Sequence, residues 1–436
     1  MRVQLQAGAR RRGRRGAHRG GARIRWRYSR RRLSRIGWGA LLGLLVLAAL
    51  AYVGFALLRP VPEVTVLAAP RASAFPGGPP RLAWPGEGEA AVGVEGMGMI
   101  GVHGSERATP IASVAKVMTA YVLLHDHPLR GGAGGPRITV NPADVAVYQS
   151  DLASGGSVVT VQAGEQLTER QALEALLLAS GNNIATLVAA WDAGSQGAFV
   201  AKMNAQARAL GLLHTHYTGA SGVETSTVST AGDQVRLAMR ALSAPAFAET
   251  VGAWQATLPV AGTQYNKDVL LGKDGIIGIK PGTTSEAGGC FLFAADAHTG
   301  GRSVTVVGAV LHQMGAGTQA SMLASAFAAS TTLLDSTRRV LVTRRVLRRG
   351  STLAWLSAPW THPLALQAGG SVSLVGWPGL PVRTTVAVAQ PLHAPIAADQ
   401  DVGSAVVSAG GRRETVRLVP AGVLPDAPLT WRLRNP

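Results

Sequence analysis

Residues 110–120 read PIASVAKVMTA, and this stretch decides the fold expected of the chain. Apolar side chains occupy most faces of the helix it predicts over Ala112–Leu124, so that helix should be buried. Positions three apart share a helix face, which allows the Ser113 hydroxyl to meet the Lys116 amine. Burial disfavours the charged amine and lowers a lysine pKa, which makes Lys116 a usable base at neutral pH. Taken alone, the S-x-x-K spacing also fits an N-cap serine followed by a surface lysine.

Two further polar motifs follow along the chain. The sequence SGN at residues 180–182 interrupts a helical pattern that runs over 167–190, and a turn there favours protruding polar groups. The sequence KPGTT at residues 280–284 follows an apolar, β-branched run, which places a cation and two hydroxyls at a strand edge. We therefore predict that a hydroxyl, an amine and a cation from three distant stretches face one cleft.

In this order, the three motifs resemble S-x-x-K, S-x-N and K-T/S-G of the penicillin-binding protein and serine β-lactamase superfamily. The stretches LTERQALEALLLASGNN and GIIGIKPGTTSEAGGC are also similar to its D-Ala-D-Ala carboxypeptidase branch. The resemblance covers about residues 85–340 and implies an α+β, β-lactamase/transpeptidase-like domain, an antiparallel sheet with a helical subdomain. It further implies a penicillin-binding enzyme that removes terminal D-alanine from peptidoglycan stem peptides, with β-lactams as inhibitors and without metal or cofactor.

The same resemblance implies a role for each motif residue. Ser113 would attack the substrate carbonyl and form an acyl-enzyme, Lys116 would take its proton, and Ser180 would relay a proton to the leaving amine. The substrate-binding residues would be Asn182, Lys280, Gly282, Thr283 and Thr284, with the N–H groups of residues 113 and 283 forming the oxyanion hole. Pro281 departs from the family pattern, because the family has a hydroxyl there that helps hold the substrate carboxylate. We expect Thr284 or Thr283 to supply that hydroxyl.

Two rival functions stay open at this point. A serine β-lactamase-like hydrolase usually needs an added carboxylate base, and none is assigned between Lys116 and Ser180. A catalytically weak sensor or scaffold that binds wall peptide or β-lactam is favoured by Pro281. Since residues 281 and 283 point the same way along a strand, the proline loses no ladder bond if that side of the strand faces an open site.

The N-terminal part of the chain differs from the rest in charge and hydropathy. Residues 1–35 hold 14 arginines and no acidic residue, so they account for most of the net charge of +18 and leave a nearly neutral remainder. We therefore expect no nucleic-acid-binding surface on the folded part. Residues 38–58 form an apolar run of 21 residues, long enough to cross a bilayer. We predict an uncleaved single-pass anchor rather than a cleaved signal peptide, with a cytoplasmic tail at 1–37 near anionic lipid and an extracytoplasmic body.

The remaining segments complete the predicted organisation. Residues 59–83, rich in proline and glycine, predict a spacer without strands, and 84–338 the α+β catalytic domain. Short strand-like runs in 339–436, of which the first covers 340–342, predict a small β-sandwich. Six arginines within 338–349 indicate a solvated face, with a membrane-facing patch as the alternative. Cys290, the single cysteine, is interpreted as a buried strand residue.

Overall fold

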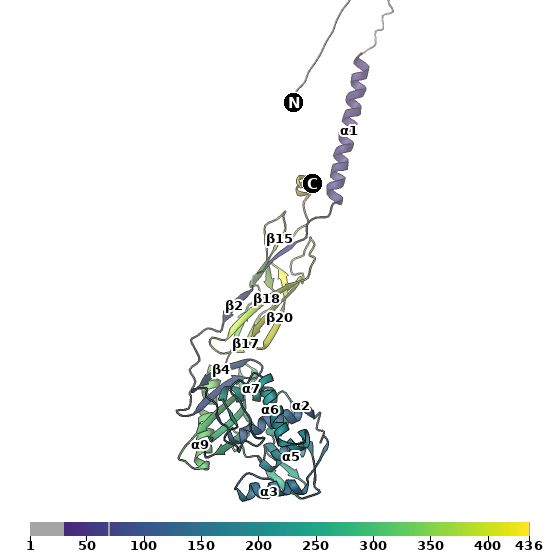
Figure 1. The fold of residues 1–436 in the computed structure, drawn as a ribbon. Helices are drawn as coiled ribbons and strands as arrows, with labels where there is room; N and C mark the ends of the chain where they lie inside the picture. The colour runs from purple at the N-terminus through teal and green to yellow at the C-terminus, as the bar shows by residue number, and fades with distance from the viewer. Residues whose placement is uncertain (1–29, 69, 436) are drawn as a thin grey trace, which may run out of the picture. The chain divides into compact units, whose positions relative to one another are not determined.

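The structure, a computed structural model, describes residues 30–68 and 70–435, with side chains from Gly37 on (Figure 1). The predicted basic tail at 1–37 therefore lies almost entirely outside the described side chains. The described residues belong to two compact units. The first consists of those up to Pro62 together with 426–435, and the second extends from Glu63 to Pro425.

The first unit contains the long apolar helix α1 (Arg30–Leu58) and the short helix α10 (Leu429–Arg434). Within α1, Gly37–Leu58 is 22 residues long with a mean hydropathy of 2.6, so by length and composition it can cross a membrane. The Tyr52 hydroxyl donates to the carbonyl of Leu433 near the C-terminal end of α1. An apolar helix this close to an N-terminus serves either as an anchor or as a signal sequence.

The centre of the second unit is an antiparallel sheet of five strands in the order β11-β12-β13-β3-β4. Every residue of β3 is buried. Helices cover one face of the sheet, and on the other face α9 packs against β11, β12 and β13. Phe291 on β12 packs edge-on against Phe327 of α9, with ring centroids 4.8 Å apart. The elements are β3 (Glu89–Val94), β4 (Gly98–His103), β11 (Ile276–Thr284), β12 (Gly288–Thr299), β13 (Arg302–Gln313) and α9 (Gln319–Val340).

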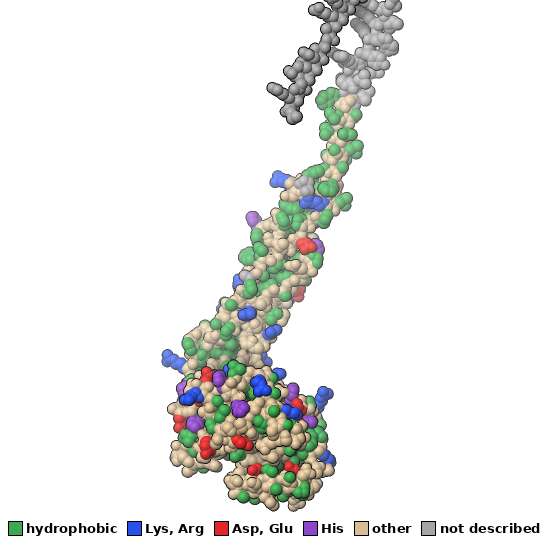
Figure 2. Space-filling model, viewed as in Figure 1, with side chains coloured by type: hydrophobic (Ala, Val, Ile, Leu, Met, Phe, Trp, Pro, Cys, Tyr) green, Lys and Arg blue, Asp and Glu red, His purple; other side chains and the backbone are tan. Residues whose placement is uncertain are grey.

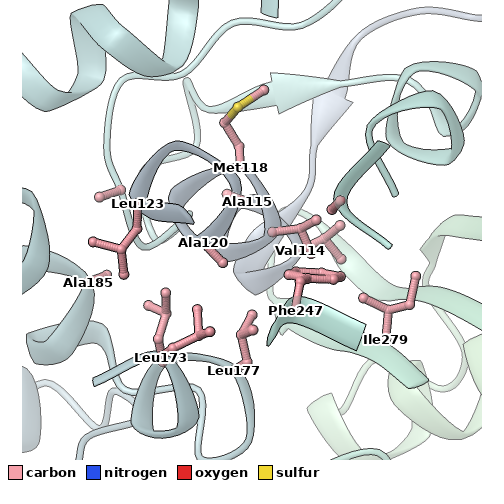
Figure 3. Close-up of a cluster of buried hydrophobic side chains, with 14 of the residues drawn as sticks. Val114, Ala115, Met118, Ala120, Leu123, Leu173, Leu177, Ala185, Phe247 and Ile279 are labelled. Atoms are coloured by element: carbon pink, nitrogen blue, oxygen red, sulfur yellow. The ribbon is translucent and has the colours of Figure 1, made fainter. Parts of the chain in front are cut away.

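A helical subdomain covers the face of the five-stranded sheet that lies opposite α9. Ala120 and Leu123 of its central helix α2 lie on the side of Leu173 and Leu177, whereas Met118 points away from them into another part of the same buried cluster (Figure 3). The helices are η1 (Ala112–Ala115), α2 (Lys116–Asp126), α3 (Pro142–Ala153), α4 (Glu169–Leu177), α5 (Asn182–Ala193), α6 (Gln196–Ala209), α7 (Ala231–Ala241) and α8 (Pro245–Val251). Three short strand pairs join them: β5 (Thr109–Pro110) with β8 (Val228–Ser229), β6 (Arg137–Thr139) with β7 (Gln166–Thr168), and β9 (Gln255–Leu258) with β10 (Gly262–Tyr265).

The helix boundaries follow from capping residues. Thr318 is the N-cap of α9, because its side chain accepts a hydrogen bond from the backbone N–H of Ser321. The pattern over 167–190 forms two helices, as predicted, and they are separated at Ser180, whose positive φ of 63° ends the helical path. The first of them begins later than the pattern indicated, because Thr168 is its N-cap and the preceding residues form β7.

The C-terminal part of the second unit is β-rich. It has a seven-stranded sheet in the order β1-β15-β16-β20-β19-β18-β2 and a separate pair, β14-β17. Its hydrophobic core is continuous with the far face of the five-stranded sheet. The strands are β1 (Thr65–Ala68), β2 (Arg71–Ala74), β14 (Val342–Leu347), β15 (Thr352–Ser357), β16 (Leu364–Ala368), β17 (Val372–Gly376), β18 (Pro381–Val388), β19 (Gly403–Ala409) and β20 (Arg412–Pro420).

Two sequence predictions about this part were wrong. The segment 59–83 was expected to lack strands, yet it supplies β1 and β2, the two edge strands of the seven-stranded sheet. Both are largely exposed, so neither shows the alternation by which a half-buried strand is recognised. A strand was also expected over 340–342, whereas α9 continues to Val340 and β14 begins at Val342.

Candidate active site

The predicted nucleophile and base lie within hydrogen-bond distance. Ser113 sits in the 3₁₀ turn η1, directly before α2, and Lys116 is the first residue of α2. The Lys116 Nζ is 2.9 Å from the Ser113 Oγ. Ala112, immediately before the serine, has a φ of +46°, a conformation that costs a non-glycine residue energy and that clusters at functional sites.

Lys116 is completely buried, and its amine has three polar neighbours. Besides Ser113, the Nζ bonds the Asn182 Oδ1 at 2.7 Å and the carbonyl of Ser221 at 2.8 Å. A neutral amine satisfies the last two acceptors with its own hydrogens and keeps a lone pair for the serine proton. Burial, and then the charges of Lys280 and Lys267, hold the Lys116 pKa well below its usual range, which favours this neutral form.

The second motif forms the start of α5 and faces the same cavity as the nucleophile. Ser180, nearly buried, lines this cavity of about 630 Å³ together with Ser113 and Asn182. Because the Asn182 Oδ1 accepts from Lys116, its amide nitrogen is available to a ligand carbonyl. The neighbouring Asn183, which the sequence left without a role, binds both the N–H and the carbonyl of Val159 and so fixes a wall of the cavity.

The third motif lies on β11, the edge strand of the five-stranded sheet. Its residue Gly282 passes so close to η1 that a β-carbon there would lie 2.8 Å from the Ser113 nitrogen and 3.1 Å from that of Val114. Only glycine permits this approach, which brings the strand and the serine together. All seven predicted site residues other than Lys116 line the one cavity: Ser113, Ser180, Asn182, Lys280, Gly282, Thr283 and Thr284.

Pro281 occupies a position on this edge strand, which agrees with its missing N–H. Its carbonyl accepts a bond of 3.0 Å from the Nζ of Lys280, a buried lysine whose pKa is lowered to about 7, first by burial and then by Lys267. The Thr284 hydroxyl accepts from the backbone N–H of Ala287, and the hydroxyl keeps its own hydrogen to donate. Both threonine side chains of the motif border the cavity.

Three charged residues of the cavity were missed by sequence reasoning. Lys267 donates to the Ser157 Oγ at 2.7 Å, and burial lowers its pKa. The carboxylates of Asp151 and Glu224 also line the cavity, and burial raises the pKa of Asp151 while Lys116 opposes that rise. No motif spacing marks these residues, because each comes from a different loop or helix end. Asp151 in particular lies in the interval between Lys116 and Ser180, where no carboxylate had been assigned.

Comparisons with known proteins agree with this geometry. Residues 100–312 match the family model described as D-alanyl-D-alanine carboxypeptidase. A D-alanyl-D-alanine carboxypeptidase from Streptomyces sp. (strain K15) is 31% identical over 216 residues, which cover 46% of this chain and 71% of that protein. The chain belongs to the D-alanyl-D-alanine carboxypeptidase family. The matched segment of the family model contains all three motifs.

Another relative is the D-alanyl-D-alanine carboxypeptidase DacB2 of Mycobacterium tuberculosis, 37% identical over 46% of this chain and 66% of its own length. The chain spans roughly half to two thirds of the length of several such relatives. Penicillin binding protein 5 from Haemophilus influenzae has a similar structure, with a TM-score of 0.54 and 18% identity over 80% of this chain and all of that one. The α+β fold expected for the family is therefore confirmed.

Proposed function

We propose that this chain is a serine-type D-Ala-D-Ala carboxypeptidase that binds penicillin and removes terminal D-alanine from peptidoglycan stem peptides. The observation that carries the proposal is the buried Lys116 amine, 2.9 Å from the Ser113 hydroxyl and held toward its neutral form. Family membership supports the same reaction class. Of the possible chemistries of a serine beside a neutral lysine, acyl transfer is the one that uses both groups.

In the acylation step, Ser113 Oγ forms a bond to the carbonyl carbon between the two D-alanines. Lys116 accepts the hydroxyl proton, and the bond to the leaving D-alanine nitrogen breaks as that proton is relayed through the Ser180 hydroxyl to the nitrogen. The N–H groups of residues 113 and 283 stabilise the oxyanion, and the close packing of Gly282 against η1 supports this pairing. Water then hydrolyses the ester and regenerates Ser113.

The substrate carboxylate is bound at the cationic end of the cavity. Lys280 and Lys267 both border the cavity there, and the Thr284 hydroxyl has a hydrogen to donate. These groups replace the hydroxyl that Pro281 lacks, so the proline is compatible with turnover. The Asn182 amide holds a backbone carbonyl of the stem peptide.

The chain is further proposed to be a single-pass membrane protein with its α+β body outside the cytoplasm. The 22-residue apolar stretch of α1 and the arginines before it support an N-terminus on the cytoplasmic side, near anionic lipid. The body is proposed to comprise residues 84–338 with a β-lactamase/transpeptidase-like fold. The C-terminal β-rich part is proposed to form a small sandwich from its two sheets.

Labelling with a fluorescent penicillin tests the acylation step. The intact chain should be labelled at Ser113, as mapped by mass spectrometry of the modified peptide, and Ser113→Ala should not be labelled. Release of D-alanine from a D-Ala-D-Ala peptide then tests turnover. An intact chain that is not labelled, or Ser113→Ala that is, would contradict the proposed nucleophile.

A second candidate function is hydrolysis of β-lactams, favoured by Asp151. This carboxylate borders the cavity between the first two motifs, where a β-lactamase-like enzyme needs an added base. Fast loss of the penicillin label, abolished in Asp151→Asn, would identify that activity. A chain that is labelled but releases no D-alanine would instead be the catalytically weak sensor or scaffold.

A further inference from the structure

Charge is divided unevenly within the second unit. Residues 84–338 contain 14 basic and 19 acidic side chains, a net charge of −5. Residues 339–425, called the β region below, contain nine arginines and three acidic residues, a net charge of +6. On the face drawn in Figure 2, acidic side chains gather mainly over the body, and basic ones recur along the β region. The excess of positive charge therefore belongs to the part without the active site.

Three of these arginines share one face of the seven-stranded sheet. In the strand register, Arg383 of β18 is opposite Ser408 of β19, and Ser408 is opposite Arg413 of β20. Arg383 and Arg413 therefore lie in one row across the sheet, with Ser408 between them. Arg417 follows four residues along β20 and, by the two-residue period of a strand, lies on the same side. All three arginines are exposed, whereas the alternate residues of β19 are buried in the core.

The spacing of this face suits a chain of repeated negative charges. Arg383 and Arg413 are separated by two strand intervals, about 10 Å, and Arg413 and Arg417 by about 13 Å along the strand. Four hydroxyl side chains lie on the same face, around the half-buried Val406: Thr385, Ser404, Ser408 and Thr415. The single acidic residue in these three strands, Glu414, alternates to the other side and binds Arg302 at 3.1 Å.

We propose that the outer face of β18, β19 and β20, named the arginine face, binds a linear anionic polysaccharide. The arginines meet its charges, and the serine and threonine hydroxyls exchange hydrogen bonds with sugar hydroxyls. The side chains among the arginines are small, and they are polar apart from Ala387 and the half-buried Val406, whereas insertion into a lipid surface requires large protruding apolar ones. A chain bound here is held by the β region while the active-site cavity stays free.

Heparin, a linear anionic polysaccharide, is the probe for the test. The full chain in neutral detergent is treated with an arginine-specific glyoxal reagent, with and without heparin, and each modified arginine is quantified by mass spectrometry. Heparin should lower modification of Arg383, Arg413 and Arg417 by at least about threefold, and added salt should restore it. Arg344 and Arg345 on β14 are exposed internal references that should change little. Because each arginine is measured separately, the arginine-rich N-terminal tail does not obscure the result.

Matched variants then show whether binding depends on the arginine face or only on the net charge of the chain. In R383Q/R413Q/R417Q, the slope of log affinity against log salt should fall by about two, whereas R344Q/R345Q/R348Q, with the same charge change, should keep its slope. R383K/R413K/R417K retains the charge and should retain most of the binding. Protection equal at all exposed arginines, no protection at the arginine face, or equal losses in the two glutamine variants would overturn the proposal. Penicillin labelling of each variant reports whether the body is folded.

Discussion

The α+β body and the β region place their basic side chains in opposite environments. In the body, Lys116 and Lys280 are fully buried, and desolvation lowers the pKa of both. In the β region, the arginines of the arginine face are exposed and stay charged. A buried amine is suited to accepting and giving protons, whereas an exposed guanidinium is suited to attracting anions. The body should therefore respond to pH and to single side chains, and the β region to salt.

The largest expected effect is loss of the buried base. Lys116→Ala removes the proposed proton acceptor of Ser113, and the rate of penicillin labelling should fall by about 10²–10⁴. The exposed lysine of the matched control Lys273→Ala contacts no predicted site residue through a hydrogen bond among the described side chains, and its labelling should be unchanged. Equal rates for the intact chain and Lys116→Ala would show that burial of this amine serves packing alone.

A methyl group at the strand edge should have the next largest effect. In Gly282→Ala, the added carbon would lie 2.8 Å from the Ser113 nitrogen, so β11 or η1 must shift. A displacement on the order of 1 Å at a reacting group costs about 10² in rate, which is the expected loss of labelling. Gly197→Ala on α6 is the control, since nothing lies within 4 Å of its added carbon. Labelling of Gly282→Ala at the normal rate would contradict the close approach.

The third effect is a dependence of stability on pH that belongs to the body. The pKa of Lys280 is lowered to about 7 in the folded chain from 10.5, and that of Lys116 is lowered as well. Between these values the unfolded chain binds more protons than the folded one, so the free energy of unfolding should rise from pH 7 to pH 9. Urea unfolding at both pH values measures this, and Lys280→Met should show a smaller rise. A fall in stability over that range would contradict the burial of these amines.

The smallest effect on stability is expected for an exposed ion pair between the body and the β region. Arg302 of the body and Glu414 of the β region are 3.1 Å apart and both are more than two-fifths exposed. A double-mutant cycle of Arg302→Ala and Glu414→Ala should give a coupling of about 0.2–1 kcal/mol in the free energy of unfolding. Added salt should reduce it further. A coupling well above this range would mean that the pair is shielded from solvent.

The candidate active site was more predictable than the rest of the fold because the proposed chemistry requires particular residue types at fixed spacings. Ser113, Lys116 and the residues of the other two motifs are visible in one sequence. The carbonyl of Ser221, in contrast, acts through the backbone, so its residue type carries no information. Asp151 and Lys267 reach the cavity only through tertiary packing, and no local pattern marks them.

The strands that were missed also have a physical explanation. β11 begins as an apolar, β-branched and largely buried run, and the strand before residues 280–284 was predicted from that pattern. β1 and β2 are held by hydrogen bonds to strands that lie far along the chain, as in the pairs Thr65–Ser357 and Arg71–Thr384, and their side chains are mostly exposed. A strand with no buried face has no hydropathy period, so its pairing is invisible until the partner strands are known.

The pairing of β1 and β2 with opposite edges of the seven-stranded sheet has a mechanical consequence. A pull on the chain from the α1 side reaches β1 first and loads its antiparallel ladder with β15, over the register from Thr65–Ser357 to Ala68–Ala354. Tension is transmitted into that sheet before it can reach β3, the first strand of the body. A load applied from the α1 side is therefore borne by the β-rich sheet before it reaches the candidate active site.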